Sequence, residues 1–142
     1  MAIDPLENYP GYSLRRASAA SMARLARRFA AFDLRPAEAT VLLVIDANPN
    51  ITQSDIGRML DIASANMAPL VSRLADRKLV ERQPVNGRSH GLVLTSTGRS
   101  VTTRAKRAVT KHERELLSKI PASQRKAFLA ALRTLWSARR SS

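Results

Sequence analysis

The sequence predicts a mainly α-helical protein with one small β-hairpin. Alanine, leucine and arginine dominate its 142 residues, and all three are strong helix formers. The five glycines are too few for an all-β fold with many turns. Apolar residues, 44% of the total, recur at three- and four-residue steps along most of the chain. The chain is therefore long and apolar enough to bury a core of its own.

Amphipathic periodicity predicts four helices in the first half of the chain. Their expected ranges are residues 12–32, 36–47, 52–60 and 64–77. Pro36 suits the first position of the second helix, and Thr52 is expected to cap the third. Ser64 is expected to cap the fourth.

Pro69 interrupts the fourth predicted helix. If the helix starts at Ser64, Pro69 falls in its second turn and removes a backbone hydrogen bond to Ala65. The helix therefore either begins nearer Asn66 or is kinked. Each alternative changes which side chains face outward.

The apolar period changes to that of β-strands after residue 78. Residues 79–82 and 92–95 have the composition of short strands, and polar turn residues lie between them at 85–91. A hairpin with a polar tip is expected. Two further helices, separated by Pro121, are expected over residues 97–118 and 123–138. The elements follow one another without a linker, which predicts one domain over residues 1–142.

The net charge of +13 indicates a polyanionic partner, but it is unevenly distributed. Residues 37–98 hold six Lys/Arg and six Asp/Glu, so this segment is neutral. Residues 99–142 hold twelve basic and two acidic residues, and residues 1–36 hold six and three. The positive charge therefore lies in the terminal segments, where ordinary solvated helix faces are the alternative interpretation.

Composition also excludes several classes of protein. The chain has no cysteine, which excludes disulfides, a cysteine nucleophile and a thiol-oxidation switch. Aromatic residues, at 4%, are too few for a protein that stacks single-stranded bases on rings. No signal peptide or run of 18 apolar residues is present, so a cytoplasmic protein without a membrane partner is expected.

Two short helices over 52–60 and 64–77, followed at once by a hairpin, are typical of a winged helix-turn-helix. A helix has the right width for the major groove of DNA, where base edges present a distinct pattern of donors and acceptors. An arginine at a hairpin tip is attracted to the negative potential of the adjacent minor groove. The sequence therefore predicts a double-stranded-DNA-binding lobe over residues 34–98.

In this region the chain resembles the multiple-antibiotic-resistance-regulator (MarR) family, and the resemblance extends over nearly its whole length. The residues that carry it are Leu34-Arg35-Pro36-Ala37-Glu38, Ile51 to Gly57, Val71 to Arg82, Asn86-Gly87-Arg88 and Leu94 to Gly98. The resemblance implies a homodimer held together by helices within residues 10–33 and 99–142. It also implies a repressor that binds a palindromic operator and is released by a small aromatic carboxylate or its coenzyme A thioester.

The resemblance also implies which side chains contact DNA. Ser64, Asn66, Ser72 and Arg73 match positions on the recognition helix, and Arg88 matches the wing-tip arginine. Arg77 is added because it lies on the same predicted helix, with ordinary surface exposure as the alternative for each of these residues.

Two departures from the family pattern occur at the wing. Asn86 stands where the family often has an acidic residue, and Gly87 and Ser89 flank Arg88 where a second basic residue is usual. His90 is the candidate for a weak substitute at the missing basic position.

The first helix and the residues before it predict an effector site. Tyr9, Tyr12, Arg15, Arg16 and Met22 combine ring-stacking surface with fixed positive charge, which suits an aromatic carboxylate or an acyl-coenzyme A. The alternative is that the two arginines only decorate the surface.

No enzyme, cofactor or metal site is expected. His90 and His112 lack companions at ligand spacing, and no phosphate loop or nucleophile motif occurs. Two binding functions remain as alternatives to a specific regulator. A basic architectural protein would coat DNA without sequence preference, and an interaction module would use the winged fold to bind protein.

Overall fold

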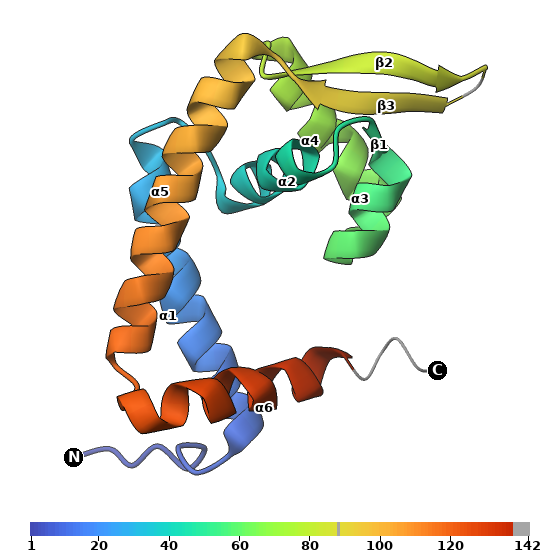
Figure 1. Ribbon diagram of the computed structural model, residues 1–142. Coiled ribbons are helices and arrows are strands. Elements are labelled where there is room, and N and C mark those ends of the chain that lie inside the picture. Colours follow the sequence, from blue (N-terminus) through green and yellow to red (C-terminus); the bar gives the residue numbers. More distant parts are fainter. Residues whose placement is uncertain (88, 138–142) are drawn as a thin grey trace. The chain divides into compact units, whose positions relative to one another are not determined.

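The computed structural model describes residues 1–87 and 89–137 (Figure 1). The chain divides into two compact units, an N-terminal unit over residues 1–109 and a C-terminal unit over residues 110–142. The N-terminal unit contains α1 (Pro10–Ala30), α2 (Pro36–Ala47), β1 (Ile51–Thr52), α3 (Gln53–Leu60), α4 (Ser64–Asp76), β2 (Val80–Asn86), β3 (Ser89–Leu94) and the first part of α5 (Ser96–Ser118). The C-terminal unit contains the rest of α5, the 3-10 helix η1 (Ala122–Gln124) and α6 (Arg125–Ser137). The mainly helical fold class and the helix-turn-helix followed by a hairpin are confirmed, whereas the single domain stays a prediction.

The core of the N-terminal unit joins the helix-turn-helix to its neighbours. The buried apolar residues of α2, α3 and α4 are Ala39, Val41, Leu42, Ile45, Ile56, Met67, Val71 and Leu74. Phe29 of α1, Leu92 of β3 and Ala105 of α5 belong to the same cluster. Burial of these apolar side chains together fixes α3 and α4 to the rest of the unit.

The sheet is larger than the sequence indicated. Its three antiparallel strands lie in the order β1-β3-β2, and β1 pairs Ile51 with Leu92. The prediction of strands over 79–82 and 92–95 was too short, since β2 and β3 continue toward the tip and leave a short turn at Gly87. The hairpin extends beyond the helices of this unit (Figure 1).

Helix ends depart from the predictions at several places. The last helix, predicted over 123–138, begins at Arg125 after η1, and Ala138 lies outside the described residues. The first helix begins at Pro10 and ends at Ala30, so Phe32 lies outside it. The predicted capping by Ser64 is wrong, because Ala63 is the N-cap of α4 and Ser64 is its first residue. The α4 helix runs continuously through Pro69. The predicted alternative of a helix that begins nearer Asn66 is wrong, because α4 begins at Ser64 and Asn66 lies inside it.

The C-terminal unit is an amphipathic pair of helical segments. Along α6, Phe128 and Leu132 are half-buried, whereas Leu129, Leu135 and Trp136 are exposed. Among residues 1–87 and 89–137, no helix combines the length and apolar character needed to span a lipid bilayer.

Candidate nucleic-acid interface

A tight turn holds α3 against α4. Asp61 ends α3 in the left-handed conformation, with φ 55°, and the backbone N–H of Ile62 donates to the carbonyl of Gly57 at 2.8 Å. A Cβ on Gly57 would lie 3.0 Å from the carbonyl oxygen of Ile62 and 3.3 Å from the Met67 side chain. Glycine at position 57 therefore permits the close approach of the two helices.

The first turn of α3 is fixed by its own side chains. The Thr52 hydroxyl oxygen accepts from the backbone N–H of Asp55 at 3.1 Å, as the predicted cap requires. The same hydroxyl donates to the Asp55 carboxylate at 2.9 Å, and Arg58 forms an ion pair with that carboxylate. These contacts, Thr52 first and then Arg58, hold the pKa of Asp55 below its usual value.

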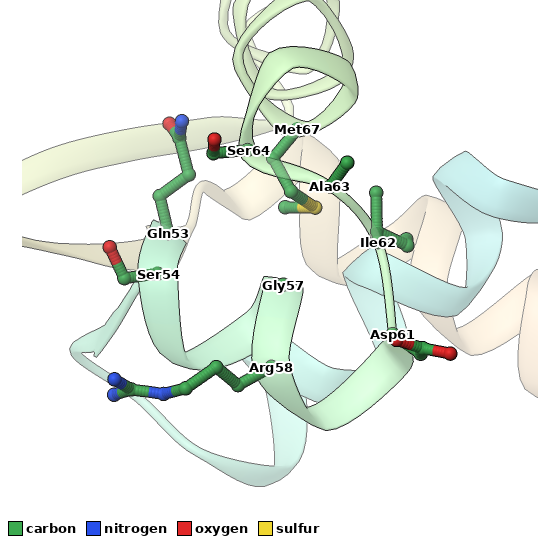
Figure 2. A pocket seen from close by; sticks show the side chains of 9 residues that line it. All are labelled: Gln53, Ser54, Gly57, Arg58, Asp61, Ile62, Ala63, Ser64 and Met67. Atoms are coloured by element: carbon green, nitrogen blue, oxygen red, sulfur yellow. The ribbon is translucent and has the colours of Figure 1, made fainter.

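An open hollow of about 500 Å³ lies between α3 and α4 (Figure 2). Gly57, Ile62 and Met67 supply its apolar part. Gln53, Ser54, Arg58 and Ser64 gather along one side of it, and Asp61 lies at the other end (Figure 2). The start of both helices thus presents amides, hydroxyls and a guanidinium, which are groups able to donate hydrogen bonds to phosphate or base edges.

A second open hollow of about 300 Å³ lies between the start of α3 and the wing. Gln53 and Ser54 line this hollow as well as the first one. On the wing side, Arg82, Ser89 and His90 complete it, and both Arg82 and His90 are exposed. The two hollows therefore form one continuous surface that extends from α4 across α3 to the hairpin, which we call the α3 surface.

The exposed side of α4 continues this surface. Ser64, Asn66 and Ser72 are exposed, as a contact with DNA requires, and Met67 and Val71 between them are buried. Pro69 is also exposed, and so is Ala65, whose carbonyl lacks its intrahelical donor because Pro69 has no N–H. Solvent can hydrate that carbonyl, which explains why the helix tolerates a proline in its second turn.

Arg73 and Arg77 are placed differently from the serines and asparagine. The Nη2 atom of Arg73 donates to Oε1 of the buried Glu38 at 2.6 Å. Nη1 of Arg77 lies 3.6 Å from Oε2 of the same carboxylate and donates to the carbonyl of Asp33 at 2.5 Å. Both guanidiniums therefore have partners within the protein.

Tyr12 is the centre of a group of charged side chains at the start of α1. Its hydroxyl donates to Asp4 at 2.9 Å and accepts from Nη1 of Arg16 at 2.7 Å. The guanidinium carbons of Arg15 and Arg16 lie 5.7 and 5.6 Å from the centre of the Tyr12 ring. The backbone N–H of Leu6, followed by the Tyr12 hydroxyl, lowers the pKa of Asp4.

Comparison with known proteins agrees with this geometry. A family model described as the MarR family matches residues 32–89. The transcriptional repressor CouR, solved bound to a 23-mer DNA duplex, is 35% identical, with 95% of this chain and 97% of CouR covered and a TM-score of 0.86. The chain belongs to the MarR family of transcriptional regulators. It is a regulator and not an enzyme.

Two further relatives match the MarR-family chain at lower identity. A protein assigned to regulation of the hcr operon in Thauera aromatica is 24% identical over 129 residues, with 89% of this chain and 78% of the relative covered. The DNA complex of MepR from S. aureus is 21% identical with a TM-score of 0.85, covering 93% of this chain and 98% of MepR. The latter similarity concerns the fold alone.

The structure brings together only part of the predicted site of this MarR-family protein. Ser64 lines the α3 surface and Asn66 and Ser72 are exposed on α4, but their contact with DNA stays a prediction. Arg88 lies outside the described residues. Tyr12, Arg15 and Arg16 lie together, whereas Tyr9 caps α1 and both Tyr9 and Met22 are exposed.

Several residues of the α3 surface were not predicted from the sequence. They are Gln53, Ser54, Arg58 and Arg82, whereas His90 was expected only as a weak substitute for the second basic residue of the wing. Gln53 and Ser54 directly follow the Thr52 cap, so their position in the first turn of α3 was a usable signal. Arg82 and His90 meet them only through the pairing of β2 with β3, which the sequence pattern did not specify at that length.

Proposed function

We propose that this MarR-family regulator is a homodimeric repressor that binds a palindromic operator. The observation that carries the proposal is the division of α4 into two sides. Met67, Val71 and Leu74 are buried in the core, and the exposed Ser64, Asn66 and Ser72 are left for the major groove. Two copies related by twofold symmetry would place their recognition helices in major grooves about one helical turn apart.

The α3 surface gives the proposed complex its phosphate contacts. Arg58 has a side chain that is 77% exposed, and Arg82 is exposed at the opposite hollow. The two cations are therefore placed on both sides of Gln53 and Ser54, whose polar groups suit phosphate oxygens. Arg88 is proposed to enter the flanking minor groove from the wing tip, because the groove concentrates negative potential.

The effector we propose is a small aromatic carboxylate or its coenzyme A thioester. The ring of Tyr12 with the guanidiniums of Arg15 and Arg16 offers stacking surface and positive charge in one place. Tyr9 and Met22 are exposed and are proposed as further apolar contacts of the effector. CouR, which is 34% identical in a second structure, was solved bound to p-coumaroyl-CoA. Binding would favour a separation of the two reading heads that no longer fits the operator. We place the repressor in the cytoplasm.

Fluorescence anisotropy tests the proposal. A labelled duplex from upstream of the protein's own gene is compared with a scrambled duplex over a series of salt concentrations. We expect the native duplex to bind about a thousandfold more tightly, with an affinity that falls as salt rises. Addition of aromatic acids and their coenzyme A thioesters to that complex is expected to release the labelled DNA.

Other outcomes of the same titration favour other functions. Equal binding to both duplexes, repeated over the flanking intergenic sequences, would support a basic architectural protein, which the charge of +13 also suits. Absence of binding at low salt would support an interaction module that recognises protein.

A further inference from the structure

Glu38 is an acidic residue in an apolar stripe. It precedes Val41, Leu42 and Ile45 of α2 at helical spacing, and like them it is buried, with its side chain only 3% exposed. A carboxylate in such a position is retained when charged partners reach it, because isolated burial of a charge is strongly unfavourable.

The partners of Glu38 come from two other segments. Oε1 accepts from Nη2 of Arg73 at 2.6 Å and from the backbone N–H of Arg35 at 3.2 Å. Oε2 accepts no hydrogen bond from the described residues and lies 3.6 Å from Nη1 of Arg77. One buried carboxylate therefore faces two guanidiniums from the C-terminal end of α4.

Arg77 extends the contact to the end of α1. Its Nη1 and Nη2 atoms donate to the carbonyls of Asp33 and Phe32 at 2.5 and 3.3 Å. These carbonyls belong to the corner between α1 and α2, where Asp33 has a φ of 53°. The C-terminal end of α4 is thereby tied to the segment that leads out of α1.

We infer that Glu38, Arg73 and Arg77 are positioning residues that set the place of α4 on the DNA-binding lobe. Arg73 and Arg77 then act on operator binding through the position of α4, and their guanidiniums do not contact DNA. The inference rests on the proposed function for its effect on DNA. Its structural basis is that Glu38 pairs with both guanidiniums, whereas the reading groups Ser64 and Asn66 lie at the other end of the helix and only Ser72 lies beside Arg73.

The physical consequence distinguishes a positioning role from a DNA contact. Removal of Arg73 alone leaves a buried carboxylate without its nearest cation, which costs more than removal of both charges together. Neutralising Glu38 in the same chain should therefore restore much of what the loss of Arg73 removes. A guanidinium that contacted phosphate would show no such recovery.

The test compares Glu38→Gln, Arg73→Gln and the Glu38→Gln/Arg73→Gln double variant. We expect Arg73→Gln to weaken operator binding about tenfold without a change in the salt slope, and the double variant to bind within about threefold of the unmodified protein. Arg82→Gln is the matched control on the α3 surface. Its loss of one phosphate contact should reduce the salt slope by about one.

Urea unfolding of the same variants supplies a readout that needs no DNA. Each single variant should lower the folding equilibrium constant. The two losses multiplied together should exceed the loss measured in the double variant by about tenfold. Additive effects of the two substitutions on the free energy of unfolding would overturn the inference. So would an Arg73→Gln variant whose salt slope falls by about one and whose operator affinity does not recover in the double variant. If the unmodified protein shows no operator preference, the proposed function fails, and the unfolding cycle alone decides the inference.

Discussion

Gly98 is the residue at which the fold leaves the least room for a side chain. A Cβ there would lie 1.9 Å from the carbonyl oxygen of Leu79, which also accepts from the backbone N–H of Thr95 at 3.1 Å. The Gly98→Ala variant must therefore move backbone at the junction of α4, β3 and α5. We expect its free energy of unfolding to fall by about 3 kcal/mol, measured by urea titration.

Gly11→Ala is the control for this prediction. Gly11 also lies in the first turn of a helix, but a Cβ there would meet no atom within 4 Å. Its free energy of unfolding should stay unchanged or rise by up to about 1 kcal/mol, because alanine is the better helix former. Equal losses in the two variants would contradict the close contact at Gly98.

Thr52 determines both a helix cap and a pKa. Loss of its hydroxyl in Thr52→Ala leaves the backbone N–H of Asp55 without its cap and should cost about 1 kcal/mol in the free energy of unfolding. The pKa of Asp55 should rise toward its usual value, because the Thr52 hydroxyl is the largest of the influences that lower it. Carbon-detected NMR titration measures this change.

The lowered pKa of Asp55 also has a consequence for stability against pH. A carboxyl with a lowered pKa stabilises the fold above the pH at which it titrates in the unfolded chain, and that contribution disappears as the pH falls through the folded-state pKa. Acidification from neutral pH should therefore narrow the difference in stability between the unmodified protein and Thr52→Ala. The exposed hydroxyl of Thr103 donates to the carbonyl of Arg99 and, among the described residues, to no carboxylate. The Thr103→Ala variant should therefore differ little in stability from the unmodified protein, and the difference should not depend on pH.

Glu38 shows what residue patterns do and do not predict. Its helical spacing from Val41, Leu42 and Ile45 was a signal that could have predicted its burial, but no buried carboxylate was predicted there. The identity of the partner was not visible, because Arg73 lies 35 residues away and meets Glu38 only through tertiary packing. A DNA contact for Arg73 stays a prediction, and its ion pair with Glu38 is an interaction that the sequence did not indicate.

At the scale of elements, helices were predicted well and strands poorly. The 36–47 helix agrees with the observed Pro36–Ala47, since a helical period extends over three turns there. The two-residue β1 has no period to detect. The turn composition near Pro84 concealed the length of β2, which is an edge strand where proline is tolerated and where the register shifts between Pro84 and Asn86.

Pro69 affects the whole recognition helix. Replacement by alanine in Pro69→Ala restores a donor for the exposed carbonyl of Ala65, so the free energy of unfolding should rise by about 2 kcal/mol. We expect the restored hydrogen bond to change the local path of α4 and to move its exposed side chains relative to the wing. Operator affinity should therefore fall by about tenfold although the protein is more stable.

Pro36→Ala is the matched control for Pro69→Ala. Pro36 occupies the first position of α2, where no intrahelical hydrogen bond is missing. Its replacement should lower the free energy of unfolding by up to about 1 kcal/mol through greater freedom of the unfolded chain. An increase in stability in both variants, or an unchanged operator affinity in Pro69→Ala, would contradict the assigned effect on α4.

At the scale of the whole molecule, charge pairing changes the meaning of the net charge. Residues 37–98 hold six basic residues, five of which the structure describes, and three of these five face carboxylates: Arg58 with Asp55, and Arg73 and Arg77 with Glu38. The DNA-binding lobe therefore exerts little long-range attraction of its own. Two lobes that act together on one operator would compensate for this weakness, since the second binds at high effective concentration.

The requirement for two lobes gives a prediction about α6. Leu129 and Trp136 are 44% and 64% exposed, and they lie on one side of the helix with the half-buried Phe128 and Leu132. We expect a second copy of the chain to cover this face, so Trp136→Glu should give a monomer in analytical ultracentrifugation. Its operator affinity should fall by at least about a hundredfold, because each monomer presents one reading head.

Thr134→Glu separates the effect of position from the effect of charge. Thr134 lies about 200° from Trp136 around α6, on the polar side of the helix. A glutamate at position 134 adds the same negative charge to the same exposed helix as a glutamate at position 136. This variant should remain dimeric and bind the operator with little change. A Trp136→Glu protein that stays dimeric would place the subunit contact elsewhere. A monomer that binds the operator at full affinity would mean that one lobe suffices, and the argument from weak single-lobe attraction would then be wrong.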